Sequence, residues 1–337
     1  MIDYNDLFKR TQYIFNKHGV EEDISETIAD VLTHANLRGV DSHGVLRVSH
    51  YINRLRKGGI NPSPDYDIQK TSSSTYTFDG DNGFGHHISK EAMKTAVTSA
   101  KNEGVGAVAV KNSSHCGALS YFVEQAANED LIGIAMTHTD KIVTPYGSSE
   151  AFFGTNPIAF AFPAREENSV ILDFATSTVA LGKILDAKER GVSIPESWGV
   201  DKNGHPTESP DEVISLSPFG GPKGYGLAMV VEIFSALLTG AAFGPHVSKM
   251  YGDYDKNREL GHFFMAVDPS KFLPVEMFTS RLDQMIREIR NTAPAKGIEQ
   301  VYVPGDIEML TASKRKADGI PLPDSVMNFI MSESSEL

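Results

Sequence analysis

The sequence has very little cysteine: Cys116 is the only one among 337 residues. A lone cysteine cannot form an internal disulfide, and this favours a reducing compartment such as the cytoplasm. Long apolar runs are also missing, because the longest candidate, residues 227–238, contains Glu232 and predicts a buried helix. The first residues are acidic and lack the basic and apolar blocks of a signal peptide. We therefore expect a soluble, cytoplasmic protein.

Basic residues are outnumbered by acidic ones. The chain has 31 Lys and Arg residues against 44 Asp and Glu residues, which gives a formal net charge of −13. A negative charge of this size repels nucleic acid and anionic lipid, so neither nucleic acid nor a membrane is an expected partner. A small anionic substrate stays compatible with the composition, because a local arginine outweighs the distant field.

Several common site motifs are absent as well. The chain contains no G-x-G-x-x-G dinucleotide fingerprint, no P-loop and no G-x-S-x-G nucleophile elbow. The spacings H-E-x-x-H and C-x-x-C are also missing, and the adjacent pair His86 and His87 would point apart on a helix. We expect no metal site, and a serine hydrolase is disfavoured.

The predicted elements alternate between helices and strands, which indicates an α/β or α+β protein with a mixed sheet. The first sixty residues have helical periodicity, with a third helix predicted near residues 45–55. Further helices are predicted near 88–103, 120–129 and 181–188, from about 224, and over 276–290. Strands are predicted at 76–78, 105–110, 132–137, 157–162 and 170–174. No linker cleanly separates two domains.

Two polar, turn-rich segments carry histidines that are candidates for chemistry. In the first, Ser42 and His43 precede a helix on which Arg47 and Tyr51 would lie one turn apart. A helix start favours anions, and a guanidinium binds a carboxylate in a bidentate manner. The segment therefore predicts an anion site; equally, it is compatible with a capping serine, a surface arginine and a histidine bonded to backbone.

The second segment is the loop that carries His115, directly after an apolar strand. Loops in this position commonly present ligand-binding residues in α/β proteins, and histidine titrates near neutral pH. The alternative is a loop histidine bonded to local carbonyl groups. Cys116 offers a different chemistry, a thiolate nucleophile for a hydrolase, although catalytic Cys–His pairs normally come from separate segments.

A third segment, residues 220–226, places glycines and Lys223 at the start of a helix. Such a helix start can hold phosphate or another anion, although a plain helix-initiating loop fits the same residues. Asp173, Phe174 and Ala175 end a predicted strand and are candidates for ribose or phosphate contacts, with a helix cap as the alternative.

Taken together, the motifs resemble the malate/L-lactate dehydrogenase family that is unrelated to the Rossmann-type enzymes of the same names. The matching stretches occur in family order over nearly the whole chain: residues 38–44, 114–117, 146–147, 153–157, 223–227 and 303–305. Within the family, the chain is most similar to the members that act on ureidoglycolate. The stretches that carry this likeness are residues 193–198, 200–204, 221–227, 243–251 and 300–305.

The resemblance implies a fold and a domain division. A non-Rossmann nicotinamide-binding domain with a mixed sheet is expected over 128–295. A helical and α+β substrate domain is expected to combine 1–127 with 296–337. The family also implies a homodimer or larger homo-oligomer with the active site near a subunit interface.

The resemblance further implies NAD-dependent oxidation of a 2-hydroxy acid, with NADP not excluded. His115 is the expected catalytic acid and base, and Ser42, His43, Arg47 and Tyr51 are expected to line the substrate site. The expected cofactor contacts are Thr139, Asp173, Phe174, Ala175, Lys223, Gly305 and Asp306. From its position we also expect Asp140 to orient His115, and Arg258 is a candidate partner for a ureido group.

The expected substrate is ureidoglycolate, whose oxidation to oxalurate belongs to allantoin and purine-nitrogen breakdown. Malate, lactate or a keto-sugar acid is the alternative within the family. A thiol hydrolase using Cys116 and a non-catalytic protein that binds small anions are the alternatives from other classes.

Overall fold

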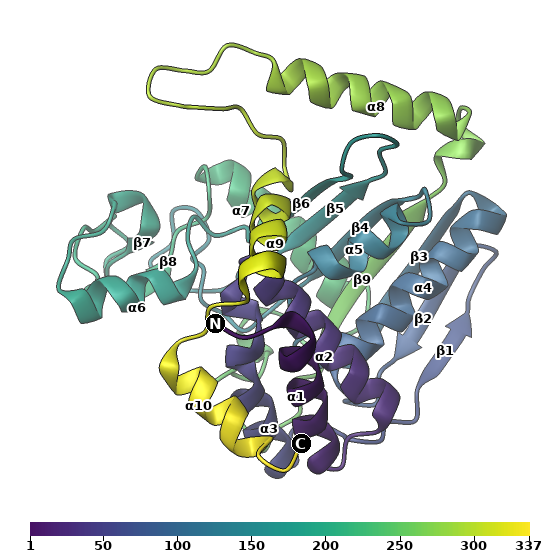
Figure 1. Cartoon of the computed structure of the whole chain (residues 1–337). Coiled ribbons are helices and arrows are strands. Elements are labelled where there is room, and N and C mark those ends of the chain that lie inside the picture. Colours follow the sequence, from purple (N-terminus) through teal and green to yellow (C-terminus); the bar gives the residue numbers. More distant parts are fainter.

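The computed structural model describes residues 1–337 and is built around one seven-stranded mixed sheet (Figure 1). The strand order is β1-β2-β3-β9-β4-β5-β6, and only β2 and β3 run parallel. The strands are β1 (Asp67–Lys70), β2 (Thr75–Asp79), β3 (Val105–Ser113), β4 (Ile132–Thr137), β5 (Ile158–Phe162), β6 (Val170–Phe174) and β9 (Leu260–Val267). The predicted α/β class is confirmed.

Helices α4 (Gly85–Glu103) and α5 (Ser120–Ala127) cover one face of this sheet. The main core lies between them and the strands, with Phe122 and Phe264 among its buried side chains. Glycines let the layers approach closely. A Cβ atom at Gly106 would lie 2.1 Å from the carbonyl oxygen of Ala96 on α4.

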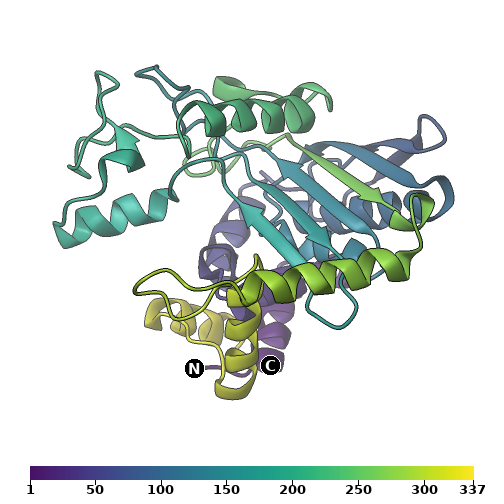
Figure 2. The same ribbon diagram turned by 90° about the horizontal axis from the view of Figure 1, so that it is seen from above.

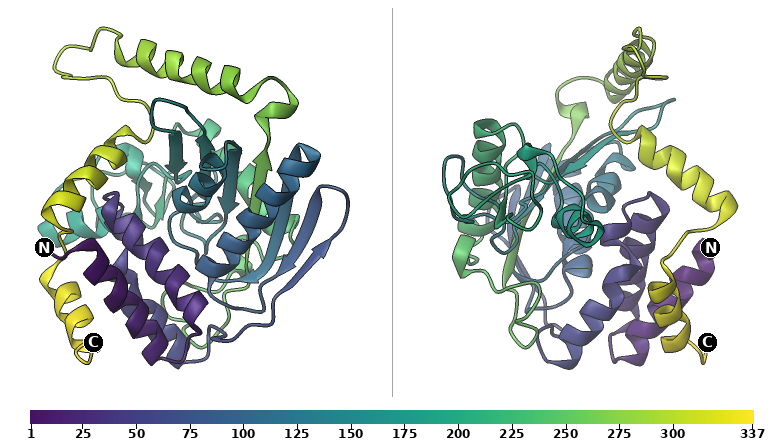
Figure 3. Two further views of the ribbon diagram at one scale, coloured as in Figure 1. Left: turned by 45° about the vertical axis from the view of Figure 1, so that its right-hand side comes forward. Right: turned by 90° about the vertical axis from the view of Figure 1, so that its left-hand side faces the viewer.

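The two chain ends pack together beside the sheet. Helices α1 (Tyr4–Lys17), α2 (Glu22–Leu37) and α3 (Val48–Arg56) share a second core with α9 (Asp306–Asp318) and α10 (Asp324–Glu333). Figure 3 shows the purple N-terminal and yellow C-terminal helices side by side. An isolated bridge between Ile2 and Ile320 joins the two ends of the chain directly.

The middle of the chain forms a smaller lobe and two further helices, α7 and α8. The lobe contains α6 (Leu181–Arg190) and the short strands β7 (Gly199–Val200) and β8 (Ser215–Leu216), with a core of its own. Helix α7 (Pro222–Glu232), which continues into a π-helical turn (Ile233–Leu237), packs on the sheet face opposite α4 and α5. Helix α8 (Val275–Arg290) lies across the strand ends (Figure 2).

Three sequence expectations differ from the structure. Strand β9 was not predicted, although it pairs with both β3 and β4 at the centre of the sheet. The apolar stretch 227–238 is not fully buried, because Met229, Ile233 and Leu237 are exposed. Residues 45–47 form a 3-10 turn and α3 begins only at Val48. The sheet also takes strands from both sides of residue 127, and the domain division stays a prediction.

Candidate functional site

His115 follows β3 and contacts two other predicted site residues. Its Nδ1 atom lies 2.7 Å from the Tyr51 hydroxyl oxygen and accepts from the Gly117 N–H at 3.3 Å. The ring stacks on His43 with ring centroids 5.7 Å apart. A backbone N–H can only donate, so Nδ1 is an acceptor in the resting ring and the ring proton lies on Nε2. The geometry leaves Nε2 as the nitrogen available to a substrate.

The surroundings of His115 favour a neutral ring. Burial lowers the pKa of His115 well below 6.5, and the positive charges of Arg47 and Arg258 lower it further. Burial and Arg47 likewise lower the pKa of His43 to about 4. Burial raises the pKa of the Tyr51 hydroxyl, which therefore stays protonated. At neutral pH the three groups offer hydrogen-bonding atoms without charge.

The His115 loop is fixed by contacts with the start of α4. Ser114 Oγ accepts from the Gly85 N–H and donates to the Gly83 carbonyl oxygen, each at 2.9 Å. A Cβ atom at Gly85 would lie 2.1 Å from the Ser114 carbonyl oxygen and 2.8 Å from the His115 carbonyl carbon. Position 85 therefore requires glycine for this loop to hold its place.

The segment with Ser42 and His43 owes its shape to a buried asparagine. Asn36 Oδ1 accepts from the Val45 N–H at 2.7 Å, and Asn36 Nδ2 donates to Asp41 at 2.6 Å. Arg315 from α9 holds the same carboxylate with bonds of 2.7 and 2.9 Å. These contacts fix the 3-10 turn (Asp41–His43), so the C-terminal helices support this side of the site.

Arg47 extends from this turn toward a loop distant in sequence. Its Nε donates to the Ser42 carbonyl oxygen at 2.8 Å, and its Nη1 donates to the Tyr251 hydroxyl. The Ser42 hydroxyl lies 2.9 Å from His43 Nδ1. The structure thus brings Ser42, His43, Arg47, Tyr51 and His115 together, and it adds Tyr251, which sequence reasoning missed.

A second arginine, Arg54, holds the loop that carries Tyr251. Arg54 is buried and donates to the carbonyl oxygens of Lys249, Met250, Asp253 and Lys256 at 2.7–3.1 Å. These four bonds tie residues 249–256 to α3. The only sequence signal was the position of Arg54 one turn after Tyr51 and His50, which does not indicate what a side chain binds.

Asp140 and Arg258 form a pair near the same site. Arg258 Nη2 donates to Asp140 Oδ1 at 2.8 Å, and the Arg258 side chain is buried. Its Nε and Nη1 atoms have no hydrogen-bond partner. No hydrogen bond joins Asp140 to His115, so the carboxylate expected to orient the histidine instead contacts the arginine.

A further buried histidine links three strands beneath the site. His262 on β9 lies with Nε2 2.8 Å from Ser113 Oγ and Nδ1 2.6 Å from Thr137 Oγ1. Burial lowers its pKa to about 3, so the ring is neutral. Ser113 precedes the His115 loop and Thr137 precedes Thr139, so this contact ties the two loops to one support. Because β9 was not predicted, no sequence pattern indicates the contacts of His262.

The predicted cofactor residues lie along connected loops at one edge of the sheet. Thr139 Oγ1 accepts from the Thr155 N–H at 3.1 Å, and Thr176 Oγ1 donates to the Thr155 carbonyl oxygen at 3.0 Å. The Phe219 N–H donates to the Thr176 carbonyl oxygen at 3.0 Å. A Cβ atom at Gly154 would lie 2.1 Å from Thr139 Oγ1, so glycine is required there. These contacts connect Thr139 with the loop before α7.

Lys223 lies in the first turn of α7, after Gly220 and Gly221, which both have positive φ. It is exposed and makes no ion pair. The α7 N-terminus with this free cation suits a phosphate group, so the residues present fit an anionic dinucleotide. Gly305, also at positive φ, lies against Ile171 of β6, with the Ile171 N–H donating to the Pro304 carbonyl oxygen at 3.2 Å.

Two acidic residues predicted as cofactor contacts also have protein partners. Asp173 Oδ2 accepts from the Ser120 N–H at the start of α5 at 2.7 Å, so it bonds the first turn of a helix distant in sequence and is not the N-cap residue of a helix that follows it. Asp306 accepts from Arg290 at 2.6 and 3.1 Å and from the Val303 N–H at 2.9 Å. Phe174 stacks edge-on against Phe219, which brings β6 next to the loop before α7. Cofactor roles for these residues stay predictions.

Cys116 lies beside His115 in sequence but faces the main core. It is buried, and burial raises the pKa of its thiol to about 12. A protonated thiol in an apolar core is a poor nucleophile. No group of three His, Cys, Asp or Glu side chains is arranged to hold a metal ion, and no helix is long and apolar enough to cross a membrane.

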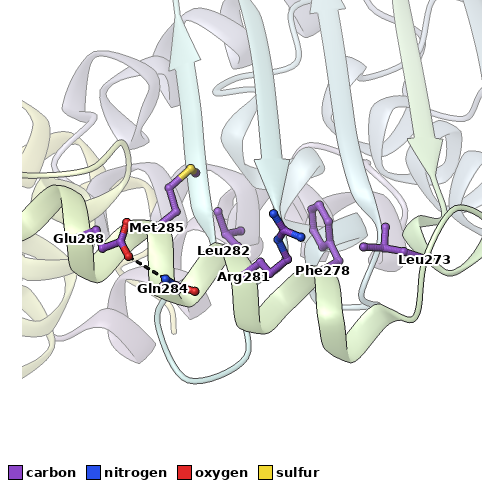
Figure 4. A pocket seen from close by; sticks show the side chains of 7 residues that line it. All are labelled: Leu273, Phe278, Arg281, Leu282, Gln284, Met285 and Glu288. Atoms are coloured by element: carbon purple, nitrogen blue, oxygen red, sulfur yellow. Dashed lines mark hydrogen bonds between the residues drawn. The ribbon is translucent and has the colours of Figure 1, made fainter.

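The hollow beneath α8 is separate from these residues. It has a volume of about 410 Å³ and is lined by Leu273, Phe278, Arg281, Leu282, Gln284, Met285 and Glu288. Phe278, Leu282 and Met285 point from α8 toward the strands (Figure 4). It contains none of the predicted site residues.

Comparison with known proteins finds one family over almost the whole chain. The family model described as malate/L-lactate dehydrogenase matches residues 2–331. Ureidoglycolate dehydrogenase (NAD(+)) from Escherichia coli (strain K12) is 40% identical over 316 residues, 94% of this chain and 90% of that protein. L-sulfolactate dehydrogenase from Methanocaldococcus jannaschii is 41% identical over 326 residues, 96% of this chain and 93% of that protein. The solved sulfolactate dehydrogenase structure from that organism has a TM-score of 0.94 and 39% identity, and it covers 99% of this chain and 96% of its own.

Proposed function

This chain belongs to the malate/L-lactate dehydrogenase family, and we propose that it oxidises a 2-hydroxy acid with NAD, most specifically ureidoglycolate to oxalurate. The observation that carries the proposal is the His115 ring beside Tyr51 and His43, within the field of Arg47. A neutral imidazole next to an arginine combines a proton acceptor with a carboxylate partner. The 2-hydroxy acid class needs both groups.

His115 is the proposed general base. It takes the hydroxyl proton on Nε2 as the carbon–hydrogen bond at C2 breaks, and the C2–O bond becomes a carbonyl. For this step the ring holds its other proton on Nδ1 and donates it to the Tyr51 oxygen, 2.7 Å away. In the reverse reduction, the doubly protonated ring that this step leaves returns its Nε2 proton to the substrate oxygen and becomes neutral again. The Tyr51 hydroxyl can donate to Nδ1 in the resting ring and accept from Nδ1–H in the charged ring, so it stabilises both forms. A positioned general base raises the reaction rate by about 10²–10⁴-fold.

Arg47 is proposed to bind the substrate carboxylate. In the structure its Nη1 contacts the Tyr251 hydroxyl, a neutral partner that a carboxylate can displace or share. Ser42 and His43 would complete the substrate site. Binding the carboxylate bidentately fixes one face of C2, and such orientation supplies a large part of catalysis in two-substrate reactions.

NAD is the proposed cofactor, and NADP is not excluded by these residues. The residues proposed to hold it are Thr139, Asp173, Phe174, Ala175, Lys223, Gly305 and Asp306. When bound, the nicotinamide supplies the acceptor for the hydride from C2. The exposed Lys223 at the start of α7 and the glycines before it are the features that suit its phosphates.

Malate or sulfolactate is the main alternative substrate, because relatives with these activities in their names are equally similar to the chain. Lactate and keto-sugar acids belong to the same class of alternatives. A thiol hydrolase is disfavoured by the buried, protonated thiol of Cys116. If ureidoglycolate is the substrate, the reaction belongs to allantoin and purine-nitrogen breakdown. A cytoplasmic location is proposed from the single cysteine alone.

A homodimer is proposed from an apolar sheet face that α7 and its π-helical turn cover only in part. Opposite α4 and α5, five apolar side chains lie side by side across β3, β9, β4, β5 and β6: Ala107, Met265, Ile134, Phe160 and Leu172. The adjoining α7 and its π-helical turn expose Met229, Ile233 and Leu237. A contiguous apolar surface of this kind favours association, and a twofold axis would let one copy cover the same face of another. Leu237→Asp should shift the mass in sedimentation equilibrium to that of a monomer.

The function is tested by following NADH formation with a panel of 2-hydroxy acids that includes ureidoglycolate, malate, sulfolactate and lactate. We expect turnover with ureidoglycolate and NAD. His115→Ala should abolish it while leaving NAD affinity, measured by fluorescence titration, nearly unchanged. Arg47→Lys should raise KM for carboxylate substrates, because lysine lacks the bidentate fork. Near-normal turnover in His115→Ala would show that another residue is the base.

A further inference from the structure

The Arg258–Asp140 pair has hydrogen-bonding atoms that no other protein group uses. Arg258 is 2% exposed, yet only its Nη2 atom is bonded, to Asp140 Oδ1. Its Nε and Nη1 atoms have no partner, and the Asp140 carboxylate, whose side chain is 25% exposed, has Arg258 as its protein partner through Oδ1, which leaves Oδ2 open. Buried donors without partners are costly, so a site that leaves them open is suited to a ligand that supplies acceptors.

Arg54 and Arg258 are both buried but differ in their hydrogen-bond partners. Arg54 is equally buried, but its two terminal nitrogens donate to four backbone carbonyl oxygens. That pattern is structural, because it binds one loop to α3. Arg258 has one side-chain partner and no backbone partner, although it follows directly after the same loop. Arg54 leaves only its Nε atom without a partner, whereas Arg258 leaves both Nε and the terminal Nη1, so the free terminal nitrogen distinguishes Arg258 from the arginine that holds the fold.

The pair lies beside the proposed chemistry. The charge of Arg258 lowers the pKa of His115, the proposed base, and Asp140 follows Thr139 at the end of the β4 segment. Arg54 is committed to four backbone carbonyl oxygens and Arg258 is paired with Asp140. Arg47 is therefore the cation left to bind a substrate carboxylate, since its partners are the Ser42 carbonyl oxygen and the Tyr251 hydroxyl.

We propose that the Arg258–Asp140 pair recognises a neutral amide or ureido group at the far end of the substrate and selects against a second anionic group. This inference rests on the proposed function, with the substrate carboxylate on Arg47. The carbonyl oxygen of the amide accepts from Arg258 Nε or Nη1, and the amide N–H donates to Asp140 Oδ2. A second carboxylate or a sulfonate in the same place faces the Asp140 carboxylate and lacks the N–H that this oxygen accepts. Asp140 is thus a specificity-determining residue rather than the group that orients His115.

The test compares two substrates of nearly identical shape: malate and its 4-amide, 2-hydroxysuccinamate. The wild-type enzyme should have the higher kcat/KM with the amide. Asp140→Asn leaves Arg258 without a counter-charge and should change the ratio of the two kcat/KM values by about 10²-fold in favour of malate. Asp318→Asn, the same change at an exposed aspartate without an ion pair, is the matched control and should leave the ratio unchanged.

Three results would overturn the inference while leaving the proposed function intact: a wild-type preference for malate over the amide, an unchanged ratio in Asp140→Asn, or an equal loss of kcat with both substrates together with a shifted pH profile. The last would show that Asp140 acts on His115. If Asp140→Asn fails to fold, Arg258→Gln replaces it, and this change should lower kcat/KM with the amide. If the wild-type enzyme oxidises no 2-hydroxy acid with NAD or NADP, the proposed function fails and this inference fails with it.

Discussion

Substituting alanine at Gly85 tests whether the position of the His115 loop sets the rate of turnover. The new Cβ atom would lie 2.1 Å from the Ser114 carbonyl oxygen and 2.8 Å from the His115 carbonyl carbon, and both are backbone atoms. Non-bonded contacts at such a Cβ need at least about 3 Å, so the loop must retreat by about 1 Å, and a misplacement of that size can reduce the rate by about 10²-fold. Crowding of this kind also costs about 1–3 kcal/mol of stability.

The assay is steady-state NADH formation, with NAD affinity and thermal unfolding measured on the same samples. We expect Gly85→Ala to lower kcat by about 10²-fold and to leave NAD affinity nearly unchanged, because the proposed cofactor residues lie on other loops. Gly182→Ala is the matched control, since its Cβ atom meets nothing within 4 Å and its backbone is helical. A folded Gly85→Ala enzyme with normal kcat would refute the argument that this loop must hold its place.

Three further predictions concern neighbouring groups. Tyr51→Phe removes the oxygen that accepts from His115 Nδ1–H in the charged ring. The pKa of His115 should therefore fall further, and kcat should drop about 10-fold. A pH–rate profile measures both changes. Arg54→Met frees four carbonyl groups, so limited proteolysis should cut within residues 249–256 and KM should rise. Burial lowers the pKa of His86 and His262 to about 3 from 6.5. The stabilisation from burying the two neutral rings is therefore complete above pH 6.5 and is lost on acidification toward pH 3, at about 1.4 kcal/mol per pH unit and group. Urea unfolding at pH 7.5 and at pH 5 measures this loss. Equal free energies of unfolding at the two pH values would contradict neutral burial of the rings.

Local patterns of apolar residues in the sequence predict several strands of the sheet. The strand predicted at 132–137 has the same limits in β4, and 105–110 is the first part of β3. The end of β3 could not be predicted, because a register shift between Val110 and Ser113 sets its last pairing with β9. A shift of this kind depends on the partner strand and leaves no periodicity of its own.

Strand β9 was missed entirely, because its sequence has no strand pattern. Six of the eight residues of β9 are buried and the other two are partly buried, since β9 lies between β3 and β4, with α4 against one face and the π-helical turn against the other. A strand of this kind has no alternation of polar and apolar residues, and Gly261 and His262 interrupt its apolar character. Gly261 is needed because a Cβ atom there would lie 1.9 Å from the Ser235 carbonyl oxygen. That requirement comes from tertiary packing.

Some residues of the candidate site could be predicted from the sequence and others could not. His115, Tyr51, His43 and Arg47 were named from the sequence, and the structure brings them together. Their chemistry is visible in the residue types and in the order of the motifs. Tyr251 ends the stretch 243–251 that carries the family likeness, but it was missed as a site residue because it is exposed and reaches Arg47 across 204 positions of sequence.

The missed residues share one physical role, which is to hold polar segments from distant parts of the chain against one another. Arg54 holds the loop 249–256, Arg315 holds Asp41, and His262 joins Ser113 to Thr137. Each contact satisfies buried donors or acceptors that would otherwise destabilise the fold, so each is strong only when both partners are in place. A site on loops needs such support to keep Arg47 and His115 in a fixed relation before substrate arrives, because orientation lost in the free enzyme must be regained from binding energy. The residues that hold the site in place are therefore the ones that a linear pattern cannot identify.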